Sequence, residues 1–328
     1  MISVQQRLAL GFALLGSALV LPVVAAAQPP AFLIQWGTPG SGNGEFNGAF
    51  GVATDLIGDV YVTDPNNNRV QKFTDQGAYL IQWGTPGSGN GQFNGAYGVA
   101  TDAAGNVYIA DPNNSRIQKF TGAGTYLTQW GSPGTGQGQF AGPFAVATNA
   151  AGDVYVTDNR NHRIQKFSGD GTYLTQWGSF GSGDGQFNAP VGVATDAAGD
   201  VYVADGNNHR IQKFSGSGTY ITQWGSLGSG DGQFGTPYGV ATDLAGDVYI
   251  SDISSNRIQK FTGTGAYLTQ WGSFGVGEGQ FSSPYCLGTD AHGNVYVADY
   301  SNSRVQKFGP LPTSTRATSW GQLKSLYR

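Results

Sequence analysis

The sequence predicts an all-β fold, a six-bladed β-propeller of four-stranded antiparallel blades that the N-terminal strand closes. Three observations lead to this prediction. Six tryptophans recur at a constant interval of 47 residues, each copy holds four short β-rich runs between turn signals, and no copy shows a helical period. The tryptophans are Trp36, Trp83, Trp130, Trp177, Trp224 and Trp271.

The second copy shows the four expected strands in order. They are "YGVAT" (97–101), "NVYIA" (106–110), "RIQKF" (116–120) and "TYLTQW" (125–130). The intervening "DAAGN", "DPNNS" and "TGAG" are rich in Gly, Pro, Asn and Asp, which favour turns. One such sheet cannot bury both of its faces alone, so the copies are expected to stack around an axis as blades.

The order of the runs predicts how the ring closes. Each of the four runs occurs six times. The tryptophan run, however, starts one run earlier than the other three, before their first copy, and does not follow their last copy. It precedes the first copy at residues 31–37 and is missing after Phe308. The N-terminal segment is therefore expected to supply the last strand of the last blade, which removes the open sheet edges. The glycine-rich phrase "QWGTPGSGNGQF" (82–93) is then an outer strand end followed by a crossover loop.

Composition limits the function. The net charge of −4 lacks the basic footprint of a nucleic-acid-binding protein, so no nucleic-acid partner is expected. The single cysteine, Cys286, excludes an intrachain disulfide, so stability must come from packing. With 39% hydrophobic and 12% aromatic residues, the 328-residue chain can build a core. We expect a monomer.

The two ends differ from the repeats. Residues 1–27 combine Arg7, an apolar run and an alanine triplet before Gln28, which predicts a cleaved bacterial signal peptide and a secreted, periplasmic or cell-surface protein. The alternative is an uncleaved anchor, because about 20 apolar residues can span a bilayer. No other span is expected. Residues 28–309 form the predicted propeller. Residues 310–328 form a Pro/Thr/Ser linker and a short basic tail, either a targeting or docking tag or a frayed end.

The segment "PYGVATDLAGDVYISDISSNRIQKF" (237–261) resembles the NHL repeat, whose progression is G-V-A-x-D, G-x-V-Y-V-x-D and N-x-R-I-x-K-F. All six copies follow it over about residues 31–308, and no Trp-Asp dipeptide of a WD repeat is present. The resemblance implies a six-bladed propeller of the TolB-like superfamily. It also implies that one face binds protein, peptide or RNA, whereas some related propellers are peptide-amidating lyases or lactonases.

Acidic and basic residues recur in every copy. Because a catalytic site occurs once, we interpret these pairs as structural, with the Asp capping a turn and pairing with the Arg. The pairs are Asp64 and Arg69, Asp111 and Arg116, Asp158 and Arg163, Asp205 and Arg210, Asp252 and Arg257, and Asp299 and Arg304. The lysine before each "RIQKF"-type phenylalanine is expected to be solvated at the blade edge.

The tryptophans allow two interpretations. They can pack between neighbouring blades, or they can be exposed platforms for sugar rings. Six equivalent platforms would make a multivalent, lectin-like propeller.

Enzyme chemistry finds little support in the residue pattern. His162 and His209 share one repeat position, whereas His292 lies in another hairpin and is expected on the opposite face. Catalytic zinc normally needs three protein ligands, so no metal, cofactor or catalytic residue is predicted. Cys286 is expected to be a buried small residue rather than a nucleophile. A lyase- or lactonase-like enzyme remains the lesser alternative.

A binding face is predicted where the copies differ. Aromatic residues before the inner strands should surround one mouth of the channel, beside the variable second hairpins that carry Arg160 and Tyr300. The alternative is that these aromatics only plug the channel. We predict a non-catalytic binding scaffold with a protein or peptide ligand first and a carbohydrate second. The expected ring consists of Phe50, Tyr97, Phe144, Val191, Tyr238 and Tyr285.

Overall fold

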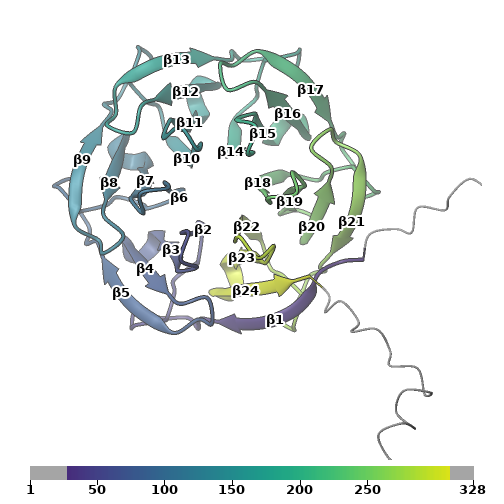
Figure 1. The fold of residues 1–328 in the computed structure, drawn as a ribbon, viewed down its shortest axis with the longest axis horizontal. Coiled ribbons are helices and arrows are strands. Elements are labelled where there is room, and N and C mark those ends of the chain that lie inside the picture. The colour runs from purple at the N-terminus through teal and green to yellow at the C-terminus, as the bar shows by residue number, and fades with distance from the viewer. Residues whose placement is uncertain (1–27, 311–328) are drawn as a thin grey trace, which may run out of the picture.

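Six four-stranded sheets surround a central axis in the computed structural model, which describes residues 28–310 (Figure 1). The 47-residue copies become the blades, and neighbouring strands within each blade run antiparallel. The predicted all-β, six-bladed architecture is confirmed. Among these residues no helix is long and apolar enough to cross a membrane. The predicted signal peptide and basic tail lie outside the described residues.

The strands are short, and their bounds repeat from blade to blade. Blades 1 and 2 consist of β2 (Val52–Thr54), β3 (Val60–Asp64), β4 (Arg69–Phe73), β5 (Tyr79–Trp83), β6 (Val99–Thr101), β7 (Val107–Asp111), β8 (Arg116–Phe120) and β9 (Tyr126–Trp130). Blades 3 and 4 consist of β10 (Pro143–Thr148), β11 (Val154–Asp158), β12 (Arg163–Phe167), β13 (Tyr173–Trp177), β14 (Pro190–Thr195), β15 (Val201–Asp205), β16 (Arg210–Phe214) and β17 (Tyr220–Trp224). Blades 5 and 6 consist of β18 (Pro237–Thr242), β19 (Val248–Asp252), β20 (Arg257–Phe261), β21 (Tyr267–Trp271), β22 (Pro284–Thr289), β23 (Val295–Asp299), β24 (Arg304–Gly309) and β1 (Ala31–Trp36).

The N-terminal strand closes the ring as predicted. Strand β1 pairs antiparallel with β24, with Ala31 opposite Gly309 and Trp36 opposite Val305. In Figure 1 the purple strand thus completes the yellow blade. Five second hairpins contain one 3₁₀ turn, namely η1 (Pro65–Asn67), η2 (Pro112–Asn114), η3 (Asn159–Asn161), η4 (Gly206–Asn208) and η5 (Tyr300–Asn302).

The core lies between blades rather than within them. Each hydrophobic cluster joins two neighbouring blades. One of them combines Val60 and Phe73 of blade 1 with Tyr296 and Val305 of blade 6. Because each blade buries its faces on its neighbours, the closed ring has no uncovered terminal blade.

The tryptophans belong to this inter-blade packing, as the first interpretation predicted. The Trp83 ring centre lies 6.2 Å from that of Tyr61 in its own blade and 5.8 Å from that of Phe120 in the next blade. The backbone of Gly124 covers the indole so closely that a Cβ there would lie 2.8 Å from it. Five tryptophans have such a glycine over the indole, namely Trp36, Trp83, Trp130, Trp177 and Trp224. Trp271 repeats the aromatic contacts, with Tyr249 and Phe308. At least five indoles therefore lack the open stacking faces on which the lectin alternative depended.

Candidate functional site: two mouths of one channel

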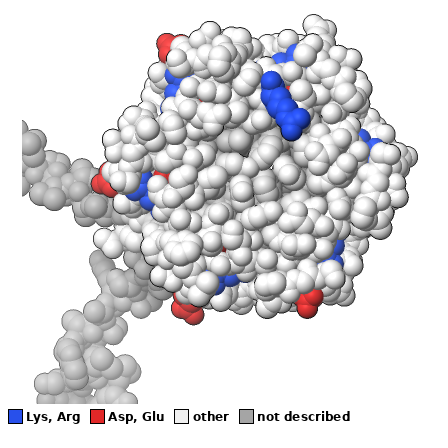
Figure 2. All heavy atoms as spheres, turned by 180° about the vertical axis from the view of Figure 1, so that it is seen from behind, with Lys and Arg blue, Asp and Glu red and all other residues white. Residues whose placement is uncertain are grey.

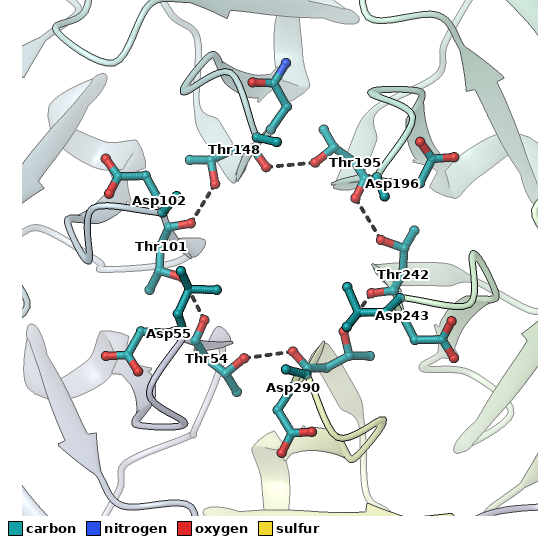
Figure 3. A pocket seen from close by; sticks show the side chains of 18 residues that line it. Thr54, Asp55, Thr101, Asp102, Thr148, Thr195, Asp196, Thr242, Asp243 and Asp290 are labelled. Carbon is teal, nitrogen blue, oxygen red and sulfur yellow. Dashed lines mark hydrogen bonds between the residues drawn. The ribbon is translucent and has the colours of Figure 1, made fainter.

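The channel has an open mouth on the face formed by the first hairpins. A pocket of about 370 Å³ lies there, lined by a threonine and an Asp or Asn of every blade (Figure 3). Asp55 shows the turn chemistry of this position, because its Oδ1 accepts the backbone N–H groups of Ile57 and Asp59. Figure 3 shows the labelled carboxylates turned away from the channel axis. The open mouth therefore presents threonines rather than free acids.

A closed ring of hydrogen bonds joins these threonines. Thr101 Oγ1 donates to the carbonyl of Thr54 at 2.7 Å, and Thr148 Oγ1 donates to the carbonyl of Thr101 at 2.6 Å. The remaining links are Thr195 to Thr148, Thr242 to Thr195, Thr289 to Thr242 and Thr54 to Thr289 (Figure 3). Every inner strand is thus tied to the next at one level of the channel.

The channel narrows behind the threonine ring. A section of about 190 Å³ lined by inner-strand Val, Ala and Thr leads to a constriction of about 40 Å³. Cys286 lines that constriction, and desolvation raises the pKa of its thiol to about 12. The thiol is therefore protonated at neutral pH, which disfavours a nucleophilic role.

The predicted aromatic residues converge and close the other mouth. Phe50 occupies the centre and is only 4% exposed. Its ring centre lies 4.6 Å from that of Tyr97 and 4.8 Å from that of Tyr285, in stacked geometry. Phe144 and Tyr238 complete the contacts at 5.6 and 6.1 Å. We call these five residues, with Tyr300, the aromatic plug; Val191, the sixth expected ring member, is buried in the neighbouring core.

The outer side of the aromatic plug is accessible. Tyr97, Phe144, Tyr238, Tyr285 and Tyr300 are all half-buried. Burial raises the pKa of Tyr97 and Tyr285, and raises that of Tyr238 well above its usual value. The Tyr300 hydroxyl accepts a hydrogen bond from Asn66, whereas no described residue bonds the other three hydroxyls. These phenols are neutral hydrogen-bonding groups on an apolar floor.

Arg160 lies at the tip of a second hairpin on this plugged face. It is exposed, and every other Lys or Arg of the described residues is buried or half-buried. The inner strands follow one another clockwise in both Figure 1 and Figure 3, so both figures view the molecule from the open mouth. Figure 2 is turned by 180° from Figure 1 and therefore shows the opposite, plugged face. That face has a shallow central hollow, almost no charge around it, and one prominent basic side chain nearby (Figure 2).

The repeated Asp and Arg residues organise the crossover loops. Arg69 Nε donates to Asp64 at 2.9 Å, while its terminal nitrogens donate to the carbonyls of Ser41, Gly42 and Glu45 and to Gln82 Oε1. All five N–H donors of the buried guanidinium are therefore satisfied. Four other blades repeat this arrangement. The glycine-rich phrase recurs because each loop must wrap around a buried arginine.

The lysines are a correction to the sequence prediction. Lys72 is not solvated, because its Nζ lies 2.7 Å from Asp59 and 5.0 Å from the centre of the Tyr61 ring. The Tyr61 hydroxyl bonds Asp55 Oδ2 at 2.9 Å. Desolvation lowers the pKa of Lys72, but its hydrogen bonds to Asp59 and Tyr61 outweigh that effect and raise it overall. Equivalent Lys–Tyr contacts occur in all six blades.

The histidines are separated as the repeat positions predicted. His162 Nδ1 accepts the N–H of Ala189, and His209 Nδ1 lies 2.8 Å from the carbonyl of Gly235, so both link a second hairpin to the next blade. His292 is in a first hairpin at the open mouth. Within residues 28–310, no group of three or more His, Cys, Asp or Glu side chains could hold a metal ion.

Sequence reasoning missed the threonine ring and the Lys–Tyr–Asp clusters. The signal was present, because a threonine ends every inner strand and a tyrosine stands second in every "VYV"-type strand. A periodic residue does not reveal its partner, however, because the threonine partners lie one blade away and the Lys–Tyr–Asp partners lie on different strands or hairpins of one blade.

Comparison with known proteins supports the fold assignment. The NHL repeat family model matches residues 93–120, 140–167, 187–214 and 281–308. The copies in blades 1 and 5 are not among the matches, although all six were expected to conform. A comparison with curated proteins gives no significant match.

Solved structures with similar folds include two enzymes. Virginiamycin B lyase from Staphylococcus aureus has a TM-score of 0.56 and 16% identity, covering 79% of this chain and 80% of that chain. A gluconolactonase from Xanthomonas campestris has a TM-score of 0.62 and 14% identity, covering 87% and 99%. A Bacteroides thetaiotaomicron protein of unknown function has a TM-score of 0.66 and 18% identity, covering 87% and 83%. At these identities the likeness concerns the fold alone. The chain carries four NHL repeats within a six-bladed β-propeller fold.

Proposed function

We propose that this chain is an exported, non-catalytic scaffold that binds a protein or peptide ligand on its plugged face. The observation that carries the proposal is the aromatic plug, in which the hydroxyls of Tyr97, Tyr238 and Tyr285 have no hydrogen-bond partner among residues 28–310, on the same face as the exposed Arg160. Aromatic and arginine side chains are the residue types that dominate binding energy at protein interfaces. The rigid blades would hold them in place at little entropic cost.

The chemistry of the repeats supports binding over catalysis. The acids at the open mouth, the Asp–Arg pairs and two of the histidines already hold hydrogen bonds within or between blades. Groups engaged in this way are poor candidates for proton transfer to a substrate.

The test is selection of peptides from a displayed random library on the purified chain, followed by affinity measurement with variants. The variant at Tyr238 must remove the hydroxyl without opening a cavity in the plug. Tyr238→Ala would leave a cavity in the plug, since Tyr238 packs 4.7 Å from Tyr285 and 5.5 Å from Phe144. We therefore combine Tyr238→Phe with Arg160→Gln and expect selected peptides to bind at least tenfold more weakly. Unchanged affinity in this double variant would rule out the plugged face.

The enzyme alternative follows from the folds of the lyase and the lactonase. Incubating the purified chain with virginiamycin B and with gluconolactone tests it directly. Turnover of either compound above the rate in buffer would replace the scaffold proposal. A glycan array tests the carbohydrate alternative in the same preparation.

A further inference from the structure

Closure of the ring by β1 creates one interface that differs from the others. At three interfaces, the third hairpin of the next blade presents a glycine carbonyl to a tyrosine and a lysine. Lys213 Nζ donates to the carbonyl of Gly263 at 3.2 Å, and the Tyr202 hydroxyl lies 3.2 Å from the same oxygen. Gly169 and Gly216 hold equivalent positions opposite Tyr108 and Lys119, and Tyr155 and Lys166.

Blade 6 has no third hairpin. The position 47 residues after Gly263 is Pro310, where the chain leaves β24, because β1 supplies the fourth strand from the other end of the sequence. Tyr249 and Lys260 are thus the equivalents of Tyr202 and Lys213, but no residue among 28–310 supplies their carbonyl. A cavity of about 340 Å³ takes its place. We call it the seam cavity, lined by Gln28, Pro30, Asp243, Tyr249, Lys260, His292, Gly293 and Pro310.

The charges at the seam cavity favour a neutral hydrogen-bond acceptor. Lys260 Nζ lies 2.6 Å from Asp247 and 3.7 Å from Asp243. These two carboxylates neutralise the ammonium, so an anion would meet repulsion beside the cation. The ammonium has three donors, and at equivalent positions one of them is given to a backbone carbonyl.

The equivalent interfaces also indicate which residue could supply the carbonyl at the seam cavity. A Cβ on Gly263 would lie 2.9 Å from the Gly246 carbonyl and 3.1 Å from the Tyr202 hydroxyl. Gly216 is confined in the same way, at 2.8 and 3.2 Å from the corresponding groups. At the seam these groups are Gly293 and Tyr249. Where Asp75 holds the equivalent position, its carbonyl keeps the bond from Lys307, but the Tyr296 hydroxyl bonds Asp290 instead of that carbonyl. A side chain on the bound residue is therefore expected to cost the contact with the tyrosine.

We propose that the seam cavity binds a glycine-containing turn of another polypeptide, whose glycine carbonyl accepts a hydrogen bond from Lys260. The ligand class follows from the chain's own interfaces, where a Ser/Thr-Gly-x-Gly turn fills this place in blades 2 to 5. Blade 1 is the exception, because Asp75 holds the position there and its backbone carbonyl accepts a hydrogen bond from Lys307 at 3.1 Å. This site is separate from the plugged face, because Lys260 and His292 lie beside the first and third hairpins.

The test uses the full chain and two synthetic peptides. The first is acetyl-FSGSGTY-amide, which copies residues 214–220. The second is its analogue with Ala in place of the first glycine. Titration calorimetry should give a dissociation constant near 1 mM for the glycine peptide, and about tenfold weaker binding for the alanine peptide.

Two lysine variants locate the site. Lys260→Met should weaken binding of the glycine peptide about tenfold, whereas the matched Lys213→Met, whose carbonyl partner is Gly263, should leave it unchanged. Circular dichroism of both variants checks that the fold is retained. Equal binding to Lys260→Met, equal binding of the two peptides, or no heat at about 10 mM peptide would overturn the proposal. Binding that appears only after residues 311–328 are removed would overturn it too, since the chain's own tail would then be the occupant.

Discussion

Asp252 Oδ2 and Arg257 Nε are 3.6 Å apart, whereas the other five pairs of the repeat lie at 2.8 or 2.9 Å. The Asp252 carboxylate instead accepts the backbone N–H groups of Gly235 and Thr236. The cause is visible two residues before the arginine, where Ser255 replaces an asparagine that the other blades carry. Arg257 Nε is consequently buried without a hydrogen bond.

Restoring the asparagine should stabilise blade 5. In blade 4 the Asn208 amide donates to Asp205 at 2.8 Å and to the Gly181 carbonyl at 2.8 Å. Ser255→Asn is expected to raise the free energy of unfolding by about 1 kcal/mol, because it supplies such bonds and returns the carboxylate to Arg257. Urea unfolding measures this difference. The reverse change, Asn208→Ser, should lower the free energy of unfolding by about 1–2 kcal/mol. A loss of stability in Ser255→Asn, or a gain in Asn208→Ser, would show that the asparagine does not position the carboxylate.

Breaking the threonine ring should destabilise the fold at one point. Thr148→Val removes the hydroxyl that donates to the Thr101 carbonyl while keeping the shape of the side chain. We expect a loss of about 1–2 kcal/mol in urea unfolding, since a carbonyl loses its partner. Thr148→Ser keeps the hydroxyl and should lose less. Equal losses for both variants would assign the effect to the methyl group instead.

A matched glycine pair tests the inter-blade packing of the tryptophans. Gly124 and Gly105 have nearly equal positive φ angles of 79° and 77°, but only Gly124 faces an indole, that of Trp83. Alanine at either position costs about 1 kcal/mol for its backbone conformation. Gly124→Ala should cost at least about 1 kcal/mol more and shift tryptophan fluorescence, because its Cβ would displace the ring. Equal stabilities of the two variants would indicate an open indole face.

Alkaline pH should unfold the propeller. Desolvation is the main cause that raises the pKa of Tyr61, Tyr202 and Tyr249 from 10.0 to about 12. The unfolded chain thus loses these protons at lower pH than the folded chain does. Their contribution to stability is complete below about pH 10 and is lost as the pH rises to about 12.

Thermal unfolding between pH 8 and 12 measures this loss, with absorbance at 295 nm reporting tyrosinate. The melting temperature should fall mainly above pH 10. Tyr202→Phe removes one of the titrating groups and should make the decline shallower. A melting temperature that stays constant to pH 12 would contradict the assignment.

The architecture could be predicted from the amino-acid sequence, because the information that specifies it is local and periodic. The constant spacing of the tryptophans fixed the size of a blade, and the missing run after Phe308 required the strand at residues 31–36 to close the ring. The six-fold occurrence of the Asp64–Arg69 type of pair also pointed away from a single catalytic centre.

The contacts of the periodic residues, by contrast, depend on how the blades pack against one another. The Thr101 hydroxyl, the Trp83 indole and the Lys119 ammonium all meet partners in a neighbouring blade, and no local pattern specifies a neighbour. The same holds for Phe50, which closes the channel because the aromatic side chains at five copies of one position converge on the axis. The seam cavity arises for the same reason. The repeat predicts a hairpin beside Tyr249 and Lys260, but strands β1 and β24 meet there, and no hairpin among residues 28–310 fills the space.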